Sequence, residues 1–349
     1  MTLVLRVSAL APEPEIIARA AQVIRAGRLV AFPTETVYGL GADALDSVAV
    51  AAIYAAKGRP ATDPLIVHIA QAEQLQALAV EIPPLAVELG RRFWPGPLTL
   101  VLKRSPAVPA NLSAGRDTIA VRQPAHPVAA ALIEASGRPI AAPSANLFSR
   151  PSPTTAGHVL HDLEGRIDLI LDGGPTSVGI ESTVLDLTLD VPAVLRPGGL
   201  PVETLRGIIP GLVVAGRTLS PGEAAASPGQ LLRHYAPRAR LLLFSGPREA
   251  VLNQMRRTLQ DSRAGGQTTG VLVPDEDRSV FAGLGVRLFP LGPLSDLDLV
   301  AHNLFAGLRE LDSLELDLIL ARDLGRAGLG LAIWDRLFRA AEGRVITVA

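Results

Sequence analysis

The sequence predicts an α/β protein with two domains, and three observations lead to this fold class. Short β-rich runs alternate with amphipathic segments from residue 3 to residue 205. A stretch rich in Gly, Pro, Ala and Ser then runs from Gly207 to Gly229, as in a connector. A second strand and helix alternation follows from residue 241 onwards. The predicted organisation is therefore a domain at 1–206, a linker at 207–237 and a domain at 238–349.

The first domain is expected to hold one wide, twisted, mixed sheet with flanking helices. Glu15–Ala26 repeats apolar residues at helical spacing and stops at Gly27, which suits the position after a helix end. Asp46 is placed to cap a second helix that ends at Lys57. Further helices are expected at Pro84–Phe93, Val128–Ser136 and Thr154–His161. Strands are expected at Leu3–Val7, Arg28–Phe32, Leu65–Ile69, Leu98–Leu102, Thr118–Arg122, Pro139–Ala142, Ile167–Leu171, Ser182–Leu187 and Ala193–Leu195.

The second domain is expected to be a smaller, three-layer, Rossmann-like α/β domain with a parallel sheet. Regular alternation of strands with helices is typical of that architecture, because each crossover helix covers one face of the sheet. The predicted strands are Leu241–Phe244, Gly270–Val273, Val286–Leu288, Leu316–Ala321 and Val345–Val348. The predicted helices are Pro247–Gln260, Asp296–Leu311 and Leu329–Ala341.

Composition excludes several classes of protein. The 33 basic and 34 acidic residues give a net charge of −1, which argues against a nucleic-acid coat or a polybasic membrane anchor. Cysteine is absent, which removes disulfides, thiolate metal sites and cysteine nucleophiles and fits a reducing cytoplasm. No signal-peptide pattern and no apolar run of about 18 residues is found. We therefore expect a cytoplasmic protein that does not cross a membrane.

Lysine is rare, and this makes one loop conspicuous. Lys57 and Lys103 are the only lysines among 33 basic residues, and neither follows a glycine, so no Walker A loop exists. Lys57-Gly-Arg59 places a compact ammonium group and a planar guanidinium group in a loop stiffened by Gly and Pro. This pair of cations is suited to binding a polyphosphate. The same pair could instead satisfy the last carbonyls of a helix. We expect Lys57 to face solvent, so that its loss would cost little stability.

Three other polar loops follow predicted strands, where α/β sheets usually present their sites. They are Pro33–Gly41, Pro143–Asn146 and Gly173–Thr183, and each also fits ordinary turn chemistry. His158 and His161 share a predicted helix face but have no third ligand nearby, so they are expected on the helix surface rather than on zinc.

Taken together, these segments resemble a known family. In order and spacing, FPTETVYGLGADA, KGRPATDPLIVHI, FWPGPLTLVL, TIAVRQP, APSANLFSRPSPTTA, GGPTSVGIESTVLDL and LRPGG resemble the YrdC-like domain of L-threonylcarbamoyladenylate synthases, over about residues 1–206. The following linker and α/β domain resemble the longer, two-domain form. The resemblance implies that L-threonine, bicarbonate and ATP are converted to threonylcarbamoyl-AMP and pyrophosphate. The product is the donor for the machinery that makes threonylcarbamoyladenosine in tRNA.

The resemblance also implies roles for particular residues. Lys57, Arg59, Ser144 and Asn146 are expected to be catalytic, with Mg²⁺ entering on the ATP phosphates and without a tightly bound prosthetic group. The linker residues His234 and Tyr235 are expected to close over the site. The expected ATP-binding residues are Lys57, Arg59, Asp63, Thr118, Ala142, Ser144, Asn146, Thr154, Arg196, His234 and Tyr235. The expected threonine-binding residues are Thr36, His68, Arg122 and Ser182.

Asp63 departs from the family pattern, in which Asn is familiar, and a carboxylate beside phosphates would repel them unless it faces Mg²⁺.

Two alternatives to the synthase remain. The first is a carbamoyltransferase that uses another carbamoyl-adenylate on the same fold, as in hydrogenase maturation, although a chain without cysteine cannot hold the zinc fingers usual there. The second is an RNA-binding module, which the net charge of −1 disfavours as the main activity, leaving a weak RNA contact.

Overall fold

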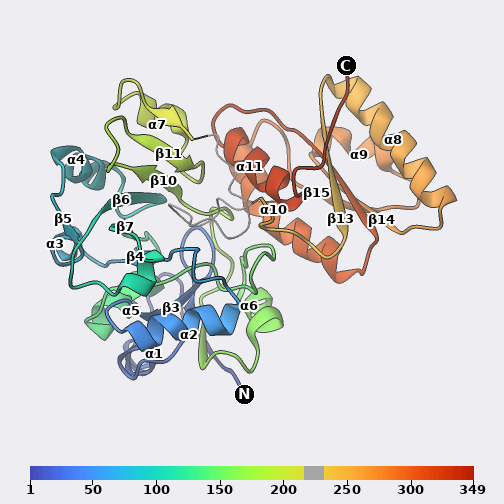
Figure 1. The fold of residues 1–349 in the computed structure, drawn as a ribbon. Helices are drawn as coiled ribbons and strands as arrows, with labels where there is room; N and C mark the ends of the chain where they lie inside the picture. The colour runs from blue at the N-terminus through green and yellow to red at the C-terminus, as the bar shows by residue number, and fades with distance from the viewer. Residues whose placement is uncertain (216–231) are drawn as a thin grey trace. The chain divides into compact units, whose positions relative to one another are not determined.

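A computed structural model of the chain describes residues 1–215 and 232–349 and divides them into two compact units (Figure 1). The first unit contains residues 1–148, 152–177 and 181–215. The second contains residues 232–349 together with two short pieces from the first half of the chain, 149–151 and 178–180. Each unit is described below by itself.

The first unit is built on a mixed sheet of 12 strands, which confirms the predicted wide sheet (Figure 1). Its order is β1-β9-β2-β3-β8-β4-β7-β6-β10-β11-β12, with β5 added beside β6. Parallel pairs such as β4 with β7 adjoin antiparallel pairs such as β6 with β7. The strands are β1 (Leu3–Arg6), β2 (Val30–Phe32), β3 (Gly39–Asp43), β4 (Ile66–His68), β5 (Ala79–Val80), β6 (Leu98–Arg104), β7 (Thr118–Arg122), β8 (Ile140–Ala141), β9 (Leu169–Asp172), β10 (Thr183–Asp186), β11 (Ala193–Arg196) and β12 (Val213–Val214).

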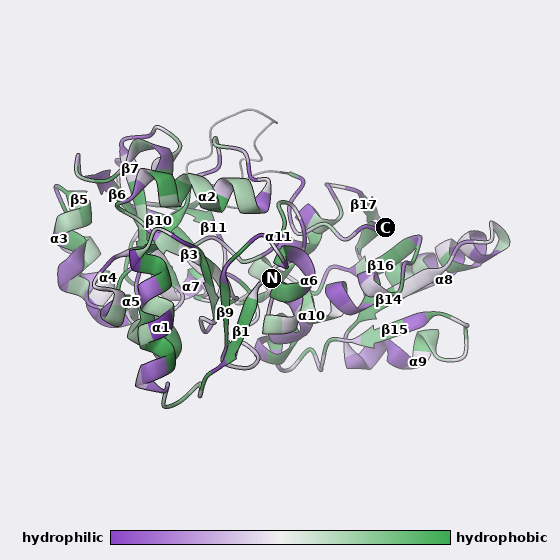
Figure 2. Ribbon diagram, turned by 90° about the horizontal axis from the view of Figure 1, so that it is seen from below, coloured by the Kyte–Doolittle hydropathy of each residue, from purple (hydrophilic) through white to green (hydrophobic). Residues whose placement is uncertain are grey.

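Helices cover this sheet with apolar faces. Figure 2 shows α1 with one hydrophobic and one hydrophilic side, as expected for a helix that packs on a sheet. The α-helices of the unit are α1 (Pro14–Arg25), α2 (Ser47–Lys57), α3 (Leu75–Leu78), α4 (Pro84–Phe93), α5 (Pro127–Ser136), α6 (Ala156–Leu163) and α7 (Val202–Arg206). Two short 3₁₀ turns, η1 (Ala72–Gln74) and η2 (Ala110–Ser113), complete it.

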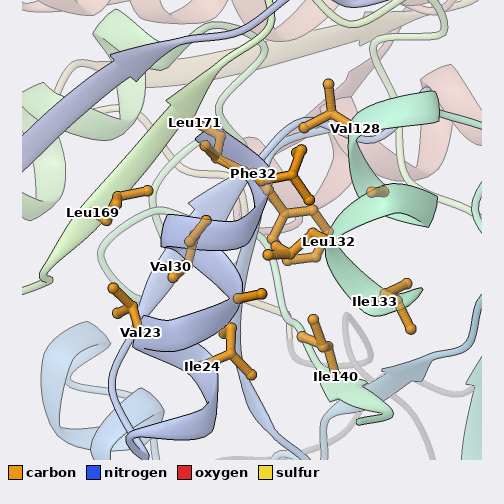
Figure 3. Close-up of a cluster of buried hydrophobic side chains, with 14 of the residues drawn as sticks. Val23, Ile24, Val30, Phe32, Val128, Leu132, Ile133, Ile140, Leu169 and Leu171 are labelled. Atoms are coloured by element: carbon orange, nitrogen blue, oxygen red, sulfur yellow. The ribbon is translucent and has the colours of Figure 1, made fainter. Parts of the chain in front are cut away.

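The hydrophobic core beside β2 joins elements that are far apart in the sequence. Phe32 on β2 is fully buried among Leu132 of α5 and Leu171 of β9, and Ile24 of α1 belongs to the same cluster (Figure 3). Burying one such side chain stabilises a fold by about 1.5–3 kcal/mol. This core fixes the end of β2, from which the Pro33–Tyr38 loop emerges.

The second unit is a three-layer domain around a parallel sheet, as predicted. Its five strands have the order β15-β14-β16-β13-β17, and every pair in it is parallel. The crossovers that contain α8 and α9 move along the sheet in the opposite direction to those of α10 and α11, so the right-handed rule places the two pairs on opposite faces. The elements are β13 (Arg240–Ser245), α8 (Arg248–Ala264), β14 (Thr269–Val273), η3 (Asp275–Asp277), α9 (Arg278–Phe281), β15 (Arg287–Pro290), α10 (Leu297–Ser313), β16 (Leu318–Arg322), α11 (Gly330–Ala340) and β17 (Val345–Thr347).

One predicted loop contains a strand. The segment Pro33–Gly41 was expected to be a polar loop, but Gly39–Asp43 forms β3 and pairs with both β2 and β8. A Cβ on Gly41 would lie 2.7 Å from Phe32 Cε1 and 2.8 Å from Ile140 Cγ2, so only glycine fits this close approach. Gly41, which looks like a turn residue in the sequence, is therefore required by packing inside the sheet.

Among the residues that the structure describes, no helix is both long enough and apolar enough to cross a membrane.

Candidate functional site

Lys57 is the last residue of α2, and it is buried. Asp46 caps the start of α2 by accepting from the amides of Val48 and Ala49, and Gly58 ends the helix in a left-handed conformation with φ 64°. The side chain of Lys57 is held inside the unit, where Nζ donates to the carbonyl oxygens of Ser144 and Asn146 at 2.5 Å each. The expectation that Lys57 faces solvent is therefore wrong, because only 2% of the residue is exposed.

The loop at Ser144 and Asn146 is positioned by Tyr38 and the start of β3. The amide of Leu40 donates to the carbonyl of Pro143, and the amide of Ala145 donates to the carbonyl of Tyr38, both at 2.8 Å. Gly39, the first residue of β3, forms an isolated antiparallel bridge with Ser144 of the loop. Two polar segments that lie about a hundred residues apart in the sequence are thus held together by backbone hydrogen bonds.

Arg59 and Asp63 form an internal ion pair next to Lys57. Arg59 Nη2 lies 3.0 Å from Asp63 Oδ2, and Arg59 Nε donates to the Asp63 carbonyl at 3.0 Å. Burial raises the pKa of the Asp63 carboxyl, while the positive charges of Arg59, Lys57 and Arg196 act in the opposite direction. Oδ1 of Asp63 has no hydrogen-bond partner among the residues that the structure describes. Asp63 is therefore a buried carboxylate within a group of three cations.

Arg196 connects the two sets of residues that the sequence separates into ATP-binding and threonine-binding. It lies at the end of β11, and its Nη2 donates to the carbonyl of Ser182 at 2.9 Å and to the Ser182 hydroxyl at 3.2 Å. The Ser182 hydroxyl is also 2.8 Å from Thr99 Oγ1. The antiparallel pairing of β10 with β11 brings Ser182 and Arg196 together although 14 residues separate them.

The expected threonine-binding residues gather around Arg122, at the end of β7. Arg122 Nη1 donates to Thr36 Oγ1 at 2.9 Å, and its Nε donates to the Gly96 carbonyl at 3.1 Å. His68 is the residue opposite Arg122 in the pairing of β4 with β7. Burial, followed by the charge of Arg122, lowers the pKa of His68 to about 3. The imidazole of His68 is therefore neutral at physiological pH.

Glu35 is a residue of this cluster that the sequence reasoning missed. Its Oε1 lies 2.6 Å from Arg122 Nη2, and both side chains are almost fully enclosed. Glu35 is the carboxylate of the segment FPTETVYGLG, and this position could have identified it as a site residue. A single Glu between two Thr residues also fits a turn, however.

The other expected site residues lie on the sheet, just after one of its strands, or just before α6. Thr118 begins β7 and lies on the same strand face as Arg122, because side chains alternate along a strand. The amide of Ala142 donates to the Ile66 carbonyl at 2.8 Å, just before the Ser144 loop. The buried Thr154 has its Oγ1 3.4 Å from His158 Nδ1, so this histidine faces Thr154. No group of three metal-binding side chains of the His, Cys, Asp or Glu type is found within residues 1–215 or 232–349.

His234 and Tyr235 belong to the second unit. Their rings are 4.0 Å apart, and the Tyr235 ring lies 5.3 Å from Phe305 of α10. Arg336 lies over the Tyr235 ring at 5.1 Å, and the amide of Ala236 donates to the Ser149 carbonyl at 2.7 Å. The end of the expected linker is therefore packed within this unit. Residues 216–231, in the middle of the expected linker 207–237, lie outside the described residues.

The chain is similar to known proteins over nearly its whole length. A family model described as "Telomere recombination", named for Sua5, YciO and YrdC, matches residues 22–198. A second model, described as "Threonylcarbamoyl-AMP synthase, C-terminal domain", matches residues 200–342. The threonylcarbamoyl-AMP synthase of Pyrococcus abyssi is 48% identical over 94% of this chain and 95% of its own length. The chain belongs to the threonylcarbamoyl-AMP synthase family.

Further relatives agree with this membership. The threonylcarbamoyl-AMP synthase of Bacillus subtilis is 47% identical over 96% of this chain and 95% of its own length. The crystal structure of P. abyssi Sua5 complexed with L-threonine covers 100% of both chains with a TM-score of 0.94 and 46% identity. The structure of Escherichia coli YciO matches 57% of this chain and 96% of its own with a TM-score of 0.52 and 28% identity. As a family member, the chain is an enzyme of the nucleotidyltransferase type.

Proposed function

We propose that the protein converts L-threonine, bicarbonate and ATP to threonylcarbamoyl-AMP, pyrophosphate and water. The threonine nitrogen bonds to the bicarbonate carbon, water leaves, and the resulting carbamate reacts with ATP. The observation that carries this proposal is the contact between Arg196 and Ser182, which connects the cations around Asp63 with Ser182 of the expected threonine set. An enzyme that attaches a carbamoylated amino acid to a nucleotide needs this adjacency of a cationic and an amino-acid-binding region. The relative with 46% identity whose structure was determined with L-threonine supports it.

In the proposed mechanism, an oxygen of the threonine carbamate attacks the α-phosphorus of ATP. A new oxygen–phosphorus bond forms, the bond from the α-phosphorus to the bridging oxygen breaks, and pyrophosphate leaves with the electron pair. Nucleophile and phosphate are both anionic, so positive charge must offset their repulsion. Lys57, Arg59 and Arg196 supply this charge, while Ser144 and Asn146 hold the phosphates. No nucleophilic side chain is required, in agreement with the absence of cysteine.

Mg²⁺ is expected to enter with ATP, and the residues present fit it. Oδ2 of the buried Asp63 carboxylate is paired with Arg59, whereas Oδ1 has no hydrogen-bond partner among the described residues. Carboxylate and phosphate oxygens are the ligands that Mg²⁺ prefers. Asp63 would hold the ion, with the Ser144 hydroxyl as a further oxygen ligand. Bound there, Mg²⁺ would neutralise charge on the triphosphate. This role would account for a carboxylate at a position where the resemblance leads us to expect Asn.

Threonine is held, in this proposal, by Thr36, His68, Arg122 and Ser182. Arg122 pairs with the carboxylate, and the neutral His68 bonds to the hydroxyl. Thr118, Ala142 and Thr154 are assigned to the nucleotide. Because serine lacks only one methyl group, which is worth about 1–3 kcal/mol in a specific pocket, serine should be a slow substrate rather than an excluded one.

We further infer from sequence that the linker 207–237, with His234 and Tyr235, closes over the bound intermediate to keep water out. The double variant His234→Ala, Tyr235→Ala should then release product that hydrolyses faster than that of the unaltered protein. A cytoplasmic location and delivery of the product to a tRNA threonylcarbamoyl-transfer machinery follow from the same proposal.

The direct test is pyrophosphate release with ATP, bicarbonate and threonine omitted one at a time. The proposal expects release only when all three are present, with no requirement for RNA. Release without threonine, or with any carbamoyl donor in place of threonine and bicarbonate, would favour the carbamoyltransferase alternative. Stimulation that depends on RNA would favour an RNA-binding role.

A further inference from the structure

Glu35 is the anionic side chain of the cluster around Arg122, and it is enclosed. Its Oε1 lies 2.6 Å from Arg122 Nη2, with 10% of the Glu35 side chain and 4% of the Arg122 side chain exposed. The contact is an ion pair, and Oε2 of Glu35 has no hydrogen-bond partner among the residues that the structure describes. A carboxylate has about four acceptor positions. Glu35 therefore has the capacity to accept from a further donor while it remains beside Arg122.

The charges around Glu35 match those of a free amino acid. Glu35 pairs with Arg122 and acts on the charge of His126, and His68 lies opposite Arg122. Burial lowers the pKa of both histidines, so both are neutral at physiological pH. Nδ1 of His126 accepts from the amide of Val128, as a neutral imidazole does. One cation and one anion therefore remain in the described part of this cluster, and their sum is zero.

An α-amino acid also carries one charge of each sign on neighbouring groups. A pocket with Arg122 alone would attract any small carboxylate. A pocket with Arg122 and Glu35 side by side favours a molecule that also presents a cation next to its carboxylate. A buried anion gains most from such a partner, because its own solvation has been lost.

We propose that Glu35 is the residue that selects for the amine of the substrate, by accepting hydrogen bonds from the α-ammonium group while Arg122 binds the carboxylate. This inference rests on the proposed function, since it names a further contact to the same substrate. Glu35 is thereby a specificity residue, and the pair Glu35 and Arg122 is a receptor for a zwitterion.

The simpler alternative is that Glu35 only holds Arg122 in position. A comparison of two ligands separates the two roles. (R)-3-Hydroxybutanoate has the carboxylate, hydroxyl and methyl groups of L-threonine and lacks the amine. The affinity of both compounds is measured by calorimetry, without ATP or bicarbonate, for the unaltered protein and for Glu35→Gln.

The expected result for Glu35→Gln is a loss of threonine affinity of about 10- to 100-fold, typical of a removed charge-assisted hydrogen bond. The affinity for (R)-3-hydroxybutanoate should change by less than about threefold, because that ligand presents nothing to Glu35. An equal loss for both ligands would overturn the proposal and assign Glu35 to the positioning of Arg122. No loss for either ligand would overturn it as well.

Two controls keep the test decisive. Asp43→Asn removes a buried carboxylate of the same sheet, whose partner Arg138 lies 3.4 Å away, and should leave both affinities unchanged. If Glu35→Gln fails to fold, the affinities of the two ligands for the unaltered protein still test the proposal. The unaltered protein must bind threonine at least about tenfold more tightly than (R)-3-hydroxybutanoate, and equal affinities would contradict a contact to the amine. Binding of threonine without pyrophosphate release would refute the proposed function and leave this inference standing.

Discussion

Acidification should destabilise the first unit through His68. In the folded protein burial lowers the pKa of this imidazole to about 3, whereas in the unfolded chain the pKa stays near its ordinary value of 6.5. Below pH 6.5 the unfolded chain therefore binds a proton that the folded protein excludes. The free energy of unfolding therefore decreases as the pH falls from 6.5 towards 3.

The magnitude follows from the two pKa values. One pKa unit corresponds to about 1.36 kcal/mol, and pH 5 lies 1.5 units below the unfolded value of 6.5. His68 alone should thus cost about 2 kcal/mol at pH 5 and almost nothing at pH 7. The result depends little on the folded pKa, because any value near 3 leaves the buried ring neutral at pH 5.

Urea denaturation followed by Trp94 fluorescence measures this effect. Trp94 is buried in the first unit, and a Trp334→Phe background removes the signal of the second unit. His68→Gln in this background should be less sensitive to acid. The stability difference between the protein with His68 and the His68→Gln variant should shift by about 2 kcal/mol between pH 7 and pH 5, in favour of the variant. Equal shifts for the two proteins would refute the reasoning, because other titrating groups cancel in the difference.

Four further outcomes are expected. Lys57→Ala should abolish pyrophosphate release, and wild-type rates would contradict its role. The same variant should lower the free energy of unfolding in urea denaturation by about 1–3 kcal/mol, because two carbonyls lose a buried donor. Lys57→Arg should be nearly as inactive, since a forked guanidinium does not replace a compact ammonium. Gly41→Ala should cost about 1–3 kcal/mol through overpacking against Phe32, measured by the same method, and an unchanged midpoint would refute it. Asp312→Asn should destabilise the second unit, followed by Trp334 fluorescence, because this carboxylate accepts from the Arg238 amide and lies 2.9 Å from Arg150 Nη1.

Sequence reasoning was most reliable where the signal is local. The helix ending at Lys57 was predicted from a capping Asp46 and an apolar pattern, and α2 (Ser47–Lys57) has that cap. The five parallel strands of the second unit were predicted from alternation alone. Such features depend on neighbours within a few residues, so one sequence contains them.

Features that depend on distant partners were missed. β3 contains no β-branched residue, and it forms because β2 and β8 pair with its two edges. The burial of Lys57 depends on carbonyls almost ninety positions further along the chain. In the sequence Glu35 resembles an ordinary turn residue, and its partner Arg122 lies on β7, far along the chain. The residues next to these positions in the sequence give no signal of such contacts, because the partners are brought close only when the sheet has formed.

The two units are not consecutive blocks of chain, and this affects how the protein can be dissected. Residues 149–151 precede the expected boundary at 206 by more than fifty positions, yet they belong to the second unit, where Arg150 pairs with Asp312 and Arg309 donates to the Pro151 carbonyl. A truncation after Gly207 therefore removes the partners of these residues along with the linker. Lost activity in that fragment would not by itself reveal a lid, whereas His234→Ala, Tyr235→Ala leaves the interlaced chain whole. Any exchange of the second unit between relatives must likewise carry matching changes at 149–151 and 178–180, so the units are expected to diverge as partners and not as independent modules.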